Sequence, residues 1–295
     1  MRRTLSALVC AALLVGCTSQ DTPEGEQTKV TTYLKPLPNQ TVEPFEFSCE
    51  WEDLPRNDKG IVNAVELAKW VTERFDKAQF LLRLEPPARV QAGELLEHIL
   101  KRAPDASRPR LLLAQLRFAD AAWWFLSTDA WAYQIDWLLY YKTAPEDPKG
   151  ENGRRLTKEE LDEAIKRAEP YVKEGNEKIR AAATVSLAHF LRYRAQRPDD
   201  KSVVDYLWKL YFYLQRYEEA LEWLEYLLAE FDRQEVPESD PLRKKYEVTR
   251  TLIHEYMAKL ELAKDDLRRQ QASPLPWRDK QLRAEQRLML SEGKQ

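Results

Sequence analysis

Apolar residues recur at helical spacing through most of the chain after Ile61, and this periodicity limits the possible folds more than any other feature. One apolar stripe in the stretch Val62 to Leu82 consists of Val65, Leu67, Trp70, Val71, Phe75 and Phe80. Further helices are predicted from Val90 to Arg102 and from Ser107 onward, where Pro109 suits a first helical turn. Because no segment of useful length alternates apolar and polar residues, we expect an all-α fold.

A well-marked helix start lies in the segment Leu156 to Leu161. Thr157 and Glu160 have the spacing of a capping box, and the two terminal leucines have that of a hydrophobic staple. Pro170 has no backbone N–H to donate, so it is expected to end or kink this helix. A second helical stretch should follow, in which Gly175 is a candidate hinge.

The charge balance excludes one class of partner. The chain has 46 Lys and Arg residues against 49 Asp and Glu residues, which gives a formal net charge of −3. A mildly acidic chain lacks the basic surface that neutralises the phosphates of nucleic acids, so we expect no nucleic-acid binding. The chain holds only 8 glycines and is rich in Leu, Ala, Glu, Lys and Arg, a composition that also favours helix.

The N-terminus has the layout of an export signal, with a basic start followed by an apolar run from Leu5 to Val15. This run is short against the roughly 20 residues that span a bilayer, so a permanent membrane helix is not expected. The residues Leu14-Val15-Gly16-Cys17 resemble the lipobox of bacterial lipoproteins. An ordinary cleaved signal peptide, with an accidental cysteine, is the alternative.

The lipobox resemblance implies a location. In that family the signal peptide, here residues 1–16, is removed, and the cysteine, here Cys17, carries the lipid. Several acyl chains give the stable attachment that a single chain does not. A residue other than Asp after the cysteine, here Thr18, generally directs such proteins of Gram-negative hosts to the outer membrane. We expect a membrane-anchored protein of the cell envelope, on the periplasmic face of the outer membrane in such a host.

Residues 17–60 are expected to form a flexible tether that precedes a helical domain over residues 61–295. Thr, Gln, Glu and scattered Pro residues dominate this part, and its apolar content is low. The portion from Phe45 to Trp51 is aromatic enough to dock on the folded domain, and the sequence leaves open whether it does. With Cys17 lipidated, Cys49 would be the remaining cysteine of the mature chain, so no internal disulfide is expected.

Two segments of the chain share an apolar pattern. Residues 92–100 and 220–228 have Ala, Glu and Leu at matching positions. In each segment the small Ala would let a partner helix approach closely, while Leu and Ile would form the buried stripe of a helical hairpin. Such hairpins must stack on neighbours to bury both faces.

Both segments resemble tetratricopeptide repeats. The first matches the family's spacing at Ala92, Leu96, Ile99, Pro104, Leu113 and Ala114. The second resembles a complete helix pair, at Leu207, Tyr211, Tyr217, Ala220, Leu224 and Leu227. The sequence departs from the family where Trp208 replaces a small residue, Gln215 a favoured Gly in the turn, and Asp232 a favoured Pro. The resemblance implies an irregular solenoid of helical hairpins, with a generic helical bundle as the alternative.

Two aromatic clusters are the main candidates for a binding site, one from Trp123 to Tyr141 and one from Tyr206 to Phe231. Rings at helical spacing usually belong to a core, but Tyr and Trp are also favoured anchors in interfaces. We take as candidate partner- or ligand-binding residues Trp123, Trp124, Trp131, Tyr133, Trp137, Tyr141, Trp208 and Tyr211.

No motif in the sequence predicts catalysis. His254-Glu255-Tyr256-Met257-Ala258 begins like a zinc-protease motif, but Ala258 replaces the second histidine, so no metal site is expected. The glycines are too scattered for a phosphate loop or a dinucleotide turn, so no cofactor is expected. We therefore expect that the protein is not an enzyme.

These features predict a lipid-anchored scaffold or adaptor of the cell envelope that binds a protein or peptide through a helical-repeat surface. The alternative is a helical lipoprotein associated with solute uptake, with a small ligand in an aromatic-lined pocket. An enzyme of unrecognised type is a third possibility. The C-terminal stretch from Trp277 to Leu290 is expected to form a capping helix or a docking helix for a partner.

Overall fold

The structure is a computed structural model that describes residues 37–143 and 157–272 of the chain. The predicted signal peptide, Cys17 and the predicted helix from Trp277 to Leu290 lie outside the described residues. The chain divides into two compact units, Met1–Glu238 and Ser239–Gln295, and each is described by itself.

Helices make up most of the described chain. They are α2 (Ala64–Arg83), α3 (Arg89–Arg102), α4 (Ser107–Thr143), α5 (Lys158–Gln196), the short 3-10 helix η2 (Lys201–Val203), α6 (Val204–Tyr213), α7 (Tyr217–Arg233) and α8 (Pro241–Ala272). Residues 37–143 and 157–272 contain no strand beyond one isolated bridge between Arg56 and Val62. The predicted all-α class is confirmed for this part of the chain.

The helix starts follow local chemistry. Asn63 caps α2, because its side-chain oxygen accepts hydrogen bonds from the backbone N–H groups of Val65 and Glu66. The predicted capping box of α5 is present, with Glu160 N donating to Thr157 Oγ1 at 3.2 Å and Thr157 N donating to Glu160 Oε2 at 2.8 Å. These bonds satisfy N–H groups that have no partner within the helix.

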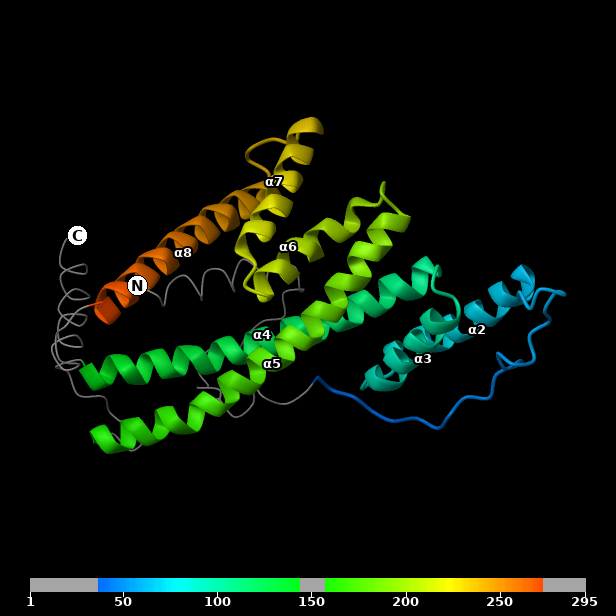
Figure 1. The fold of residues 1–295 in the computed structure, drawn as a ribbon, viewed down its shortest axis with the longest axis horizontal. Coiled ribbons are helices and arrows are strands. Elements are labelled where there is room, and N and C mark those ends of the chain that lie inside the picture. The colour runs from blue at the N-terminus through cyan, green and yellow to red at the C-terminus, as the bar shows by residue number, and fades with distance from the viewer. Residues whose placement is uncertain (1–36, 144–156, 273–295) are drawn as a thin grey trace. The chain divides into compact units, whose positions relative to one another are not determined.

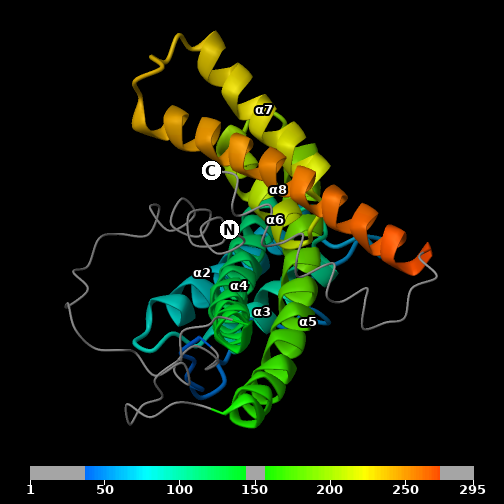
Figure 2. The ribbon, with the colours of Figure 1, turned by 90° about the vertical axis from the view of Figure 1, so that its left-hand side faces the viewer.

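Two long helices, α4 and α5, lie side by side and form the centre of the first unit (Figures 1 and 2). Of the two expected effects of Pro170, an end or a kink, the end is not found, since α5 continues through this residue. Pro170 and Lys166, whose carbonyl loses its helical donor there, are both exposed, so water can replace the missing hydrogen bond.

Small residues bring α4 and α5 together. One seam of α4 presents Ala114, Ala121 and Thr128, each one heptad apart. Ser186 of α5 donates a hydrogen bond to the carbonyl of Ala114 at 2.8 Å. Gly175 is buried against Thr128, and a Cβ atom at this position would overlap Thr128 Oγ1. Gly175 thus serves close helix approach in this structure.

The main core of this unit lies between α4, α5 and α6 and is rich in rings. Tyr206 stacks on Phe190 with ring centroids 4.8 Å apart, and Tyr213 stacks on Phe125 at 4.6 Å. Aliphatic side chains surround these rings, namely Ile179, Leu187, Leu207 and Leu210. Much of the second aromatic cluster is therefore core.

The predicted helix pair around Gln215-Arg216 is confirmed as α6 and α7. The turn between them holds Gln215 at φ 60°, in the left-handed region that favours glycine. Tetratricopeptide repeats, which this segment resembles in sequence, favour Gly at this position. The turn therefore keeps its conformation with a residue less suited to it.

Residues 37–63, here called the N-terminal strap, pack along α3 and α2 (Figure 1, blue to cyan). Phe45 meets the ring of Phe80 edge-on at 6.1 Å, and Trp51 meets Trp70 at 5.3 Å. Leu54 is buried with Leu96, Ile99 and Leu113. The portion from Phe45 to Trp51 thus docks on the helices, and most of the strap belongs to the stretch for which a tether was expected.

The strap also supplies a cap that α3 lacks. Ala88, at the N-cap of α3, has no side chain to accept a hydrogen bond. Asn39 Oδ1 of the strap accepts from Val90 N at 3.0 Å instead. The side-chain amide of Gln91 bonds both backbone groups of Val42, each at 2.8 Å. Polar pairing therefore fixes the strap at the start of α3.

A buried arginine fixes the middle of the strap. Arg74 of α2 is 1% exposed, and its Nη2 donates to Cys49 O at 2.9 Å and to Glu50 Oε2 at 3.2 Å. The guanidinium lies 4.1 Å from the ring centroid of Phe47 and 4.2 Å from that of Trp70. A desolvated cation over an aromatic face gains about 2 kcal/mol, so this contact holds the strap strongly.

The second unit contains α8. Asp240 caps it, because its side-chain oxygen accepts from Leu242 N at 2.9 Å and from Arg243 N at 3.0 Å. Pro241 at the first helical position needs no N–H partner. An ion pair between Arg243 and Glu247, one turn apart, supports the first turns.

The close approach at Gly175 generates a prediction about stability. Gly175→Ala should destabilise the protein by about 1–3 kcal/mol, because the new methyl group overlaps Thr128. Gly93→Ala in α3 is the matched control, since its Cβ would meet Leu116 Cδ2 at an ordinary 3.4 Å. That control should be neutral or gain up to about 1 kcal/mol from helix propensity.

Urea unfolding of both variants checks this expectation. Adding Thr128→Ala to Gly175→Ala should restore part of the loss, because it removes the overlapping hydroxyl. Equal stability of Gly175→Ala and Gly93→Ala would contradict the close approach.

Candidate functional site

A small groove between the strap, α3 and α4 combines charged and aromatic side chains. Its lining residues, which we call the Arg–Trp groove, are Leu37, Asn39, Arg89, Val90, Arg117, Asp120, Trp123 and Trp124. Its volume is about 150 Å³. Because three separate segments meet here, the groove exists only when the strap is seated.

Helical spacing places the residues of α4 on this groove. Arg117, Asp120 and Trp124 are three and four residues apart, so they share one face of the helix. Trp124 also packs against the core between α4, α5 and α6, so this wall of the groove is held by core packing. Arg89 and Val90 come from the first turn of α3, next to its cap by Asn39.

One carboxylate joins the two arginines of the groove. Arg89 Nη2 donates to Asp120 Oδ1 at 2.9 Å and to Leu116 O at 3.3 Å. Arg117 lies 3.6 Å from Asp120 Oδ2 and donates to Glu97 Oε1 at 2.6 Å. The side chains of Arg89 and Asp120 are mostly shielded from water, which strengthens their pairing relative to exposed ion pairs. These bonds hold the charged wall in a fixed shape.

The groove can accept one large side chain together with polar backbone groups. Pockets for drug-sized ligands usually measure about 300–1,000 Å³, so a cavity of this size suits a single anchor residue better than a whole small molecule. Tryptophan faces provide apolar contact, and guanidinium N–H groups can donate to peptide carbonyls or a carboxylate. An extended peptide with one amphipathic anchor matches this chemistry.

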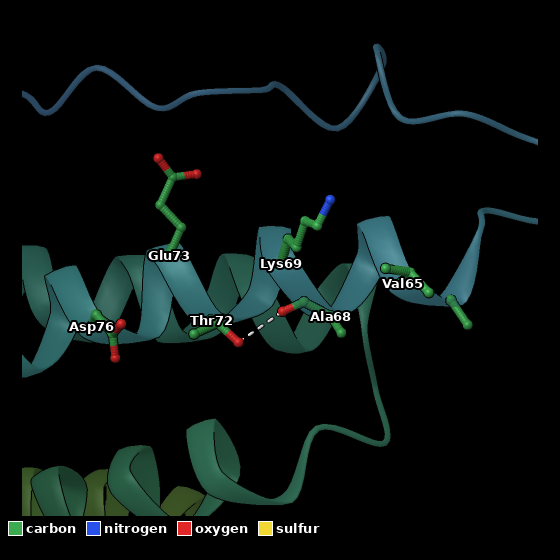
Figure 3. Close-up of a pocket in the computed structure, with 7 residues that line it drawn as sticks. Val65, Ala68, Lys69, Thr72, Glu73 and Asp76 are labelled. Atoms are coloured by element: carbon green, nitrogen blue, oxygen red, sulfur yellow. Dashed lines mark hydrogen bonds between the residues drawn. The ribbon is translucent and has the colours of Figure 1, made fainter.

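A larger depression lies on the outer face of α2 (Figure 3). It is lined by Ala64, Val65, Ala68, Lys69, Thr72, Glu73 and Asp76, all from this one helix. Figure 3 shows the side chains fanning out from the helix, with Thr72 Oγ1 donating to Ala68 O at 2.8 Å. Because the lining has no opposing wall, this surface cannot enclose a ligand.

The structure brings only two of the sequence-predicted site residues, Trp123 and Trp124, into the Arg–Trp groove. Further along α4, Trp131 is buried and stacks on Tyr171 of α5 with ring centroids 4.6 Å apart. Tyr133 is 49% exposed on the same helix. The side chains of Trp137 and Tyr141, like Cys17, lie outside the described residues.

Two further sequence-predicted site residues lie in α6, far along the chain from the groove. Trp208 is fully buried and its indole Nε1 donates to Asp205 Oδ1 at 3.0 Å. Tyr211 belongs to the main core, and the guanidinium of Arg216 lies 4.8 Å from its ring centroid. Both rings contribute to packing.

Sequence reasoning missed the polar half of the groove. Arg117 and Asp120 interrupt a largely apolar stretch of α4 one turn before the paired tryptophans, and this was a usable signal. No sequence signal pointed to Arg89 or to the strap residues Leu37 and Asn39, because only the folded chain brings them beside α4.

A half-buried histidine lies close to this charged network. His189 Nδ1 of α5 is 3.5 Å from Arg110 Nη1. Burial lowers the pKa of His189 below its ordinary value, and the charge of Arg110 lowers it further. Burial and the charges of Arg74 and Arg102 likewise lower the pKa of His98. Within the described residues, no group of three or more His, Cys, Asp or Glu side chains could hold a metal ion.

Comparisons with known proteins add no family to this geometry. No model of a protein family, no curated protein and no solved structure matches the chain. Among the helices that the structure describes, none is both long and apolar enough to span a membrane.

The lowered histidine pKa values predict a pH dependence of stability. Between the folded-state pKa and the unfolded value near 6.5, the unfolded chain binds more protons than the native protein. Stability should therefore fall as the pH drops below about 6.5 and be fully present above it.

Urea unfolding at pH 7.5 and 5.5 measures this effect. The difference in stability between the two pH values should shrink in His189→Gln and shrink further in His98→Gln/His189→Gln. An unchanged difference in the double variant would contradict the assigned protonation. The carboxyls with lowered pKa values, such as that of Asp200, titrate below this window.

Proposed function

We propose that the protein is a lipid-anchored adaptor of the cell envelope that binds an extended segment of a partner protein in the Arg–Trp groove. The observation that carries the proposal is the combination of two tryptophans with a fixed Arg–Asp–Arg bridge around a space of about 150 Å³. Aromatic and arginine side chains in a partly desolvated pocket are the usual energetic centre of a protein interface. The proposal assigns the protein no catalytic role.

The size of the groove favours a peptide over the small-ligand alternative. A buried ligand of drug size needs at least about twice this volume. A single peptide side chain fits, and the rest of an extended peptide can lie along the strap and the first turn of α3.

We further propose that α2–α3, α4–α5 and α6–α7 form a short, irregular solenoid of tetratricopeptide-like hairpins. Successive pairing of neighbouring helices supports this view. The middle hairpin departs most, because α4 and α5 have 37 and 39 residues where a whole repeat has about 34. In this arrangement the groove lies where the first hairpin meets the second.

The lipid anchor generates a direct prediction. Cys17→Ser should move the protein from the membrane fraction to the soluble fraction of the envelope, because attachment depends on acyl chains at that residue. Far-UV circular dichroism should not change, since the substitution precedes the strap. A membrane-bound Cys17→Ser protein would contradict the lipobox interpretation.

Site-specific photo-crosslinking in cells tests the binding function. A photoreactive residue at Val90, 56% exposed in the groove, should yield a defined crosslinked envelope protein. The same residue at Tyr133, 49% exposed elsewhere on α4, is the matched control and should not.

The tryptophan wall supplies the specificity test. Adding Trp123→Ala should reduce the Val90 product at least tenfold, since removing an interface anchor usually costs about 2 kcal/mol. Equal products from Val90 and Tyr133, or a Val90 product that survives Trp123→Ala, would contradict the proposal.

A further inference from the structure

The outer face of α2 carries two large apolar side chains that the fold leaves in water. Val65 is 63% exposed and Phe80 is 50% exposed. We infer that this face is a self-association surface, on which α2 of one copy packs antiparallel against α2 of a second copy. The inference goes beyond the proposed function, because none of the residues that line the Arg–Trp groove lies on this face.

Helical spacing places the side chains of this surface in one row. At 3.6 residues per turn, five of them fall within about 80° of arc around the helix axis. They are Val65, Lys69, Thr72, Asp76 and Phe80, which we call the α2 face. The first four also line the open depression on α2 (Figure 3). The lining of that depression comes from α2 alone, so a second helix can supply the missing wall.

The order of residues along the α2 face is self-complementary. Val65 and Phe80 lie equally far from a point just after Thr72, at about 11 Å on either side along the helix axis. Lys69 and Asp76 lie equally far from the same point, at about 5 Å. A twofold axis through this point sets Val65 of one copy against Phe80 of the second. It likewise sets Lys69 against Asp76, and each contact occurs twice, as a closed dimer requires.

The two charged residues of the α2 face are open to a partner. The side chain of Lys69 is 70% exposed and pairs with Glu66 of the same helix at 2.9 Å, an exposed contact of the kind that contributes little. Asp76 is exposed, and it has no ion pair within residues 37–143 and 157–272. Opposite charges that meet across an interface fix its register and disfavour other pairings.

Charged neighbours of the α2 face are held by the strap instead. Both carboxylate oxygens of Glu73 accept hydrogen bonds from Ser48, from its backbone N at 2.9 Å and from its Oγ at 2.8 Å. Lys77 Nζ lies 4.7 Å from the ring centroid of Phe45. These contacts direct both side chains toward the strap. Lys69 and Asp76 therefore remain as the charges near the twofold axis.

The place of α2 in the fold explains why this face is open. α2 is the first helix that the structure describes, and its buried residues, such as Trp70 and Leu81, lie on the side opposite to the α2 face. A helix at the end of a stack normally has a polar outer face, which keeps the protein soluble. Val65 and Phe80 depart from that pattern, as expected of a surface that a second copy covers.

The expected dimer is weak and reversible. A helix of 20 residues is about 30 Å long, and one helix pair of that length buries less than the roughly 1,200 Å² of a stable interface. We therefore expect a dissociation constant in the micromolar range. Copies that the proposed lipid anchor confines to one membrane would meet at a higher effective concentration.

Sedimentation equilibrium of the mature chain, residues 17–295 with Cys17→Ser in reducing buffer, tests the inference. Monomer and dimer should be in equilibrium, and Lys69→Asp or Asp76→Lys should each weaken dimerisation at least tenfold, because two like-charged pairs then meet. The double variant Lys69→Asp/Asp76→Lys restores both pairs with exchanged signs, so its affinity should return to within about threefold of the unaltered chain. Lys173→Asp, the same charge change at an exposed position of α5, is the matched control and should have no effect.

Recovery in the double variant also excludes misfolding as the cause of the losses, because that chain contains both substitutions. A chain that stays monomeric at several hundred micromolar would overturn the inference and leave the α2 face to a partner of another kind. Unaltered affinity in both single variants would overturn it too, as would a double variant that dimerises no better than either single variant.

Disulfide formation in cells tests the position of the twofold axis. At the distance of about 8–10 Å between the axes of packed helices, the Cα atoms of Thr72 in the two copies lie roughly 4–6 Å apart, which a disulfide can bridge. Thr72→Cys in the full chain with Cys49→Ser should therefore give a covalent dimer under oxidising conditions. Thr184→Cys, at an exposed position of α5, is the matched control and should not. Absence of the Thr72→Cys dimer, or equal amounts from both variants, would contradict the antiparallel α2 pairing.

Discussion

A buried cation on α2 is the interaction on which the N-terminal part of the molecule depends. Arg74 reaches the backbone carbonyl of Cys49 and the ring of Phe47, so it binds both the path and the side chains of the strap. Breaking a buried, paired charge typically costs about 3–5 kcal/mol, far more than a surface ion pair contributes. The strap is therefore part of the folded unit, and its position at the start of α3 follows from this anchorage together with the cap by Asn39.

The Arg–Trp groove results from that arrangement. Trp124 packs against the core between α4, α5 and α6, Asp120 pairs with both arginines of the groove, and the strap forms the third wall. A chain that arrives from the proposed lipid anchor must pass this groove before it reaches the helices. Because Leu37 and Asn39 belong to both the strap and the groove, the shape of the groove depends on how the strap is seated.

Local chemistry made much of the fold predictable from the sequence. The helix around Trp70, the capping box of Thr157 and Glu160, and the turn at Gln215 each depend on neighbours in the chain, and the structure contains all three. Of the apolar residues predicted along α2, however, Val65 and Phe80 are exposed, and the buried face combines Trp70 with Arg74, Ala78 and Leu81. The sequence left open whether the helix ends at Pro170 or continues through it, because this depends on solvent exposure of the freed carbonyl. The groove was half predicted, because Trp123 and Trp124 are conspicuous in sequence while their partners Arg89 and Asn39 arrive through tertiary packing.

Coupling between the strap and the groove can be measured in a single variant. Arg74→Met keeps an unbranched apolar side chain but removes the guanidinium, with its charge and its hydrogen bonds to Cys49 O and Glu50 Oε2. Photo-crosslinking at Val90 in this variant is the decisive measurement, with amide exchange of residues 40–54 recorded alongside to report release of the strap. The predicted result is that the Val90 product is lost and that residues 40–54 lose their protection from exchange, while the helix content is unchanged. A released strap with an undiminished Val90 product would contradict the groove as a three-walled site.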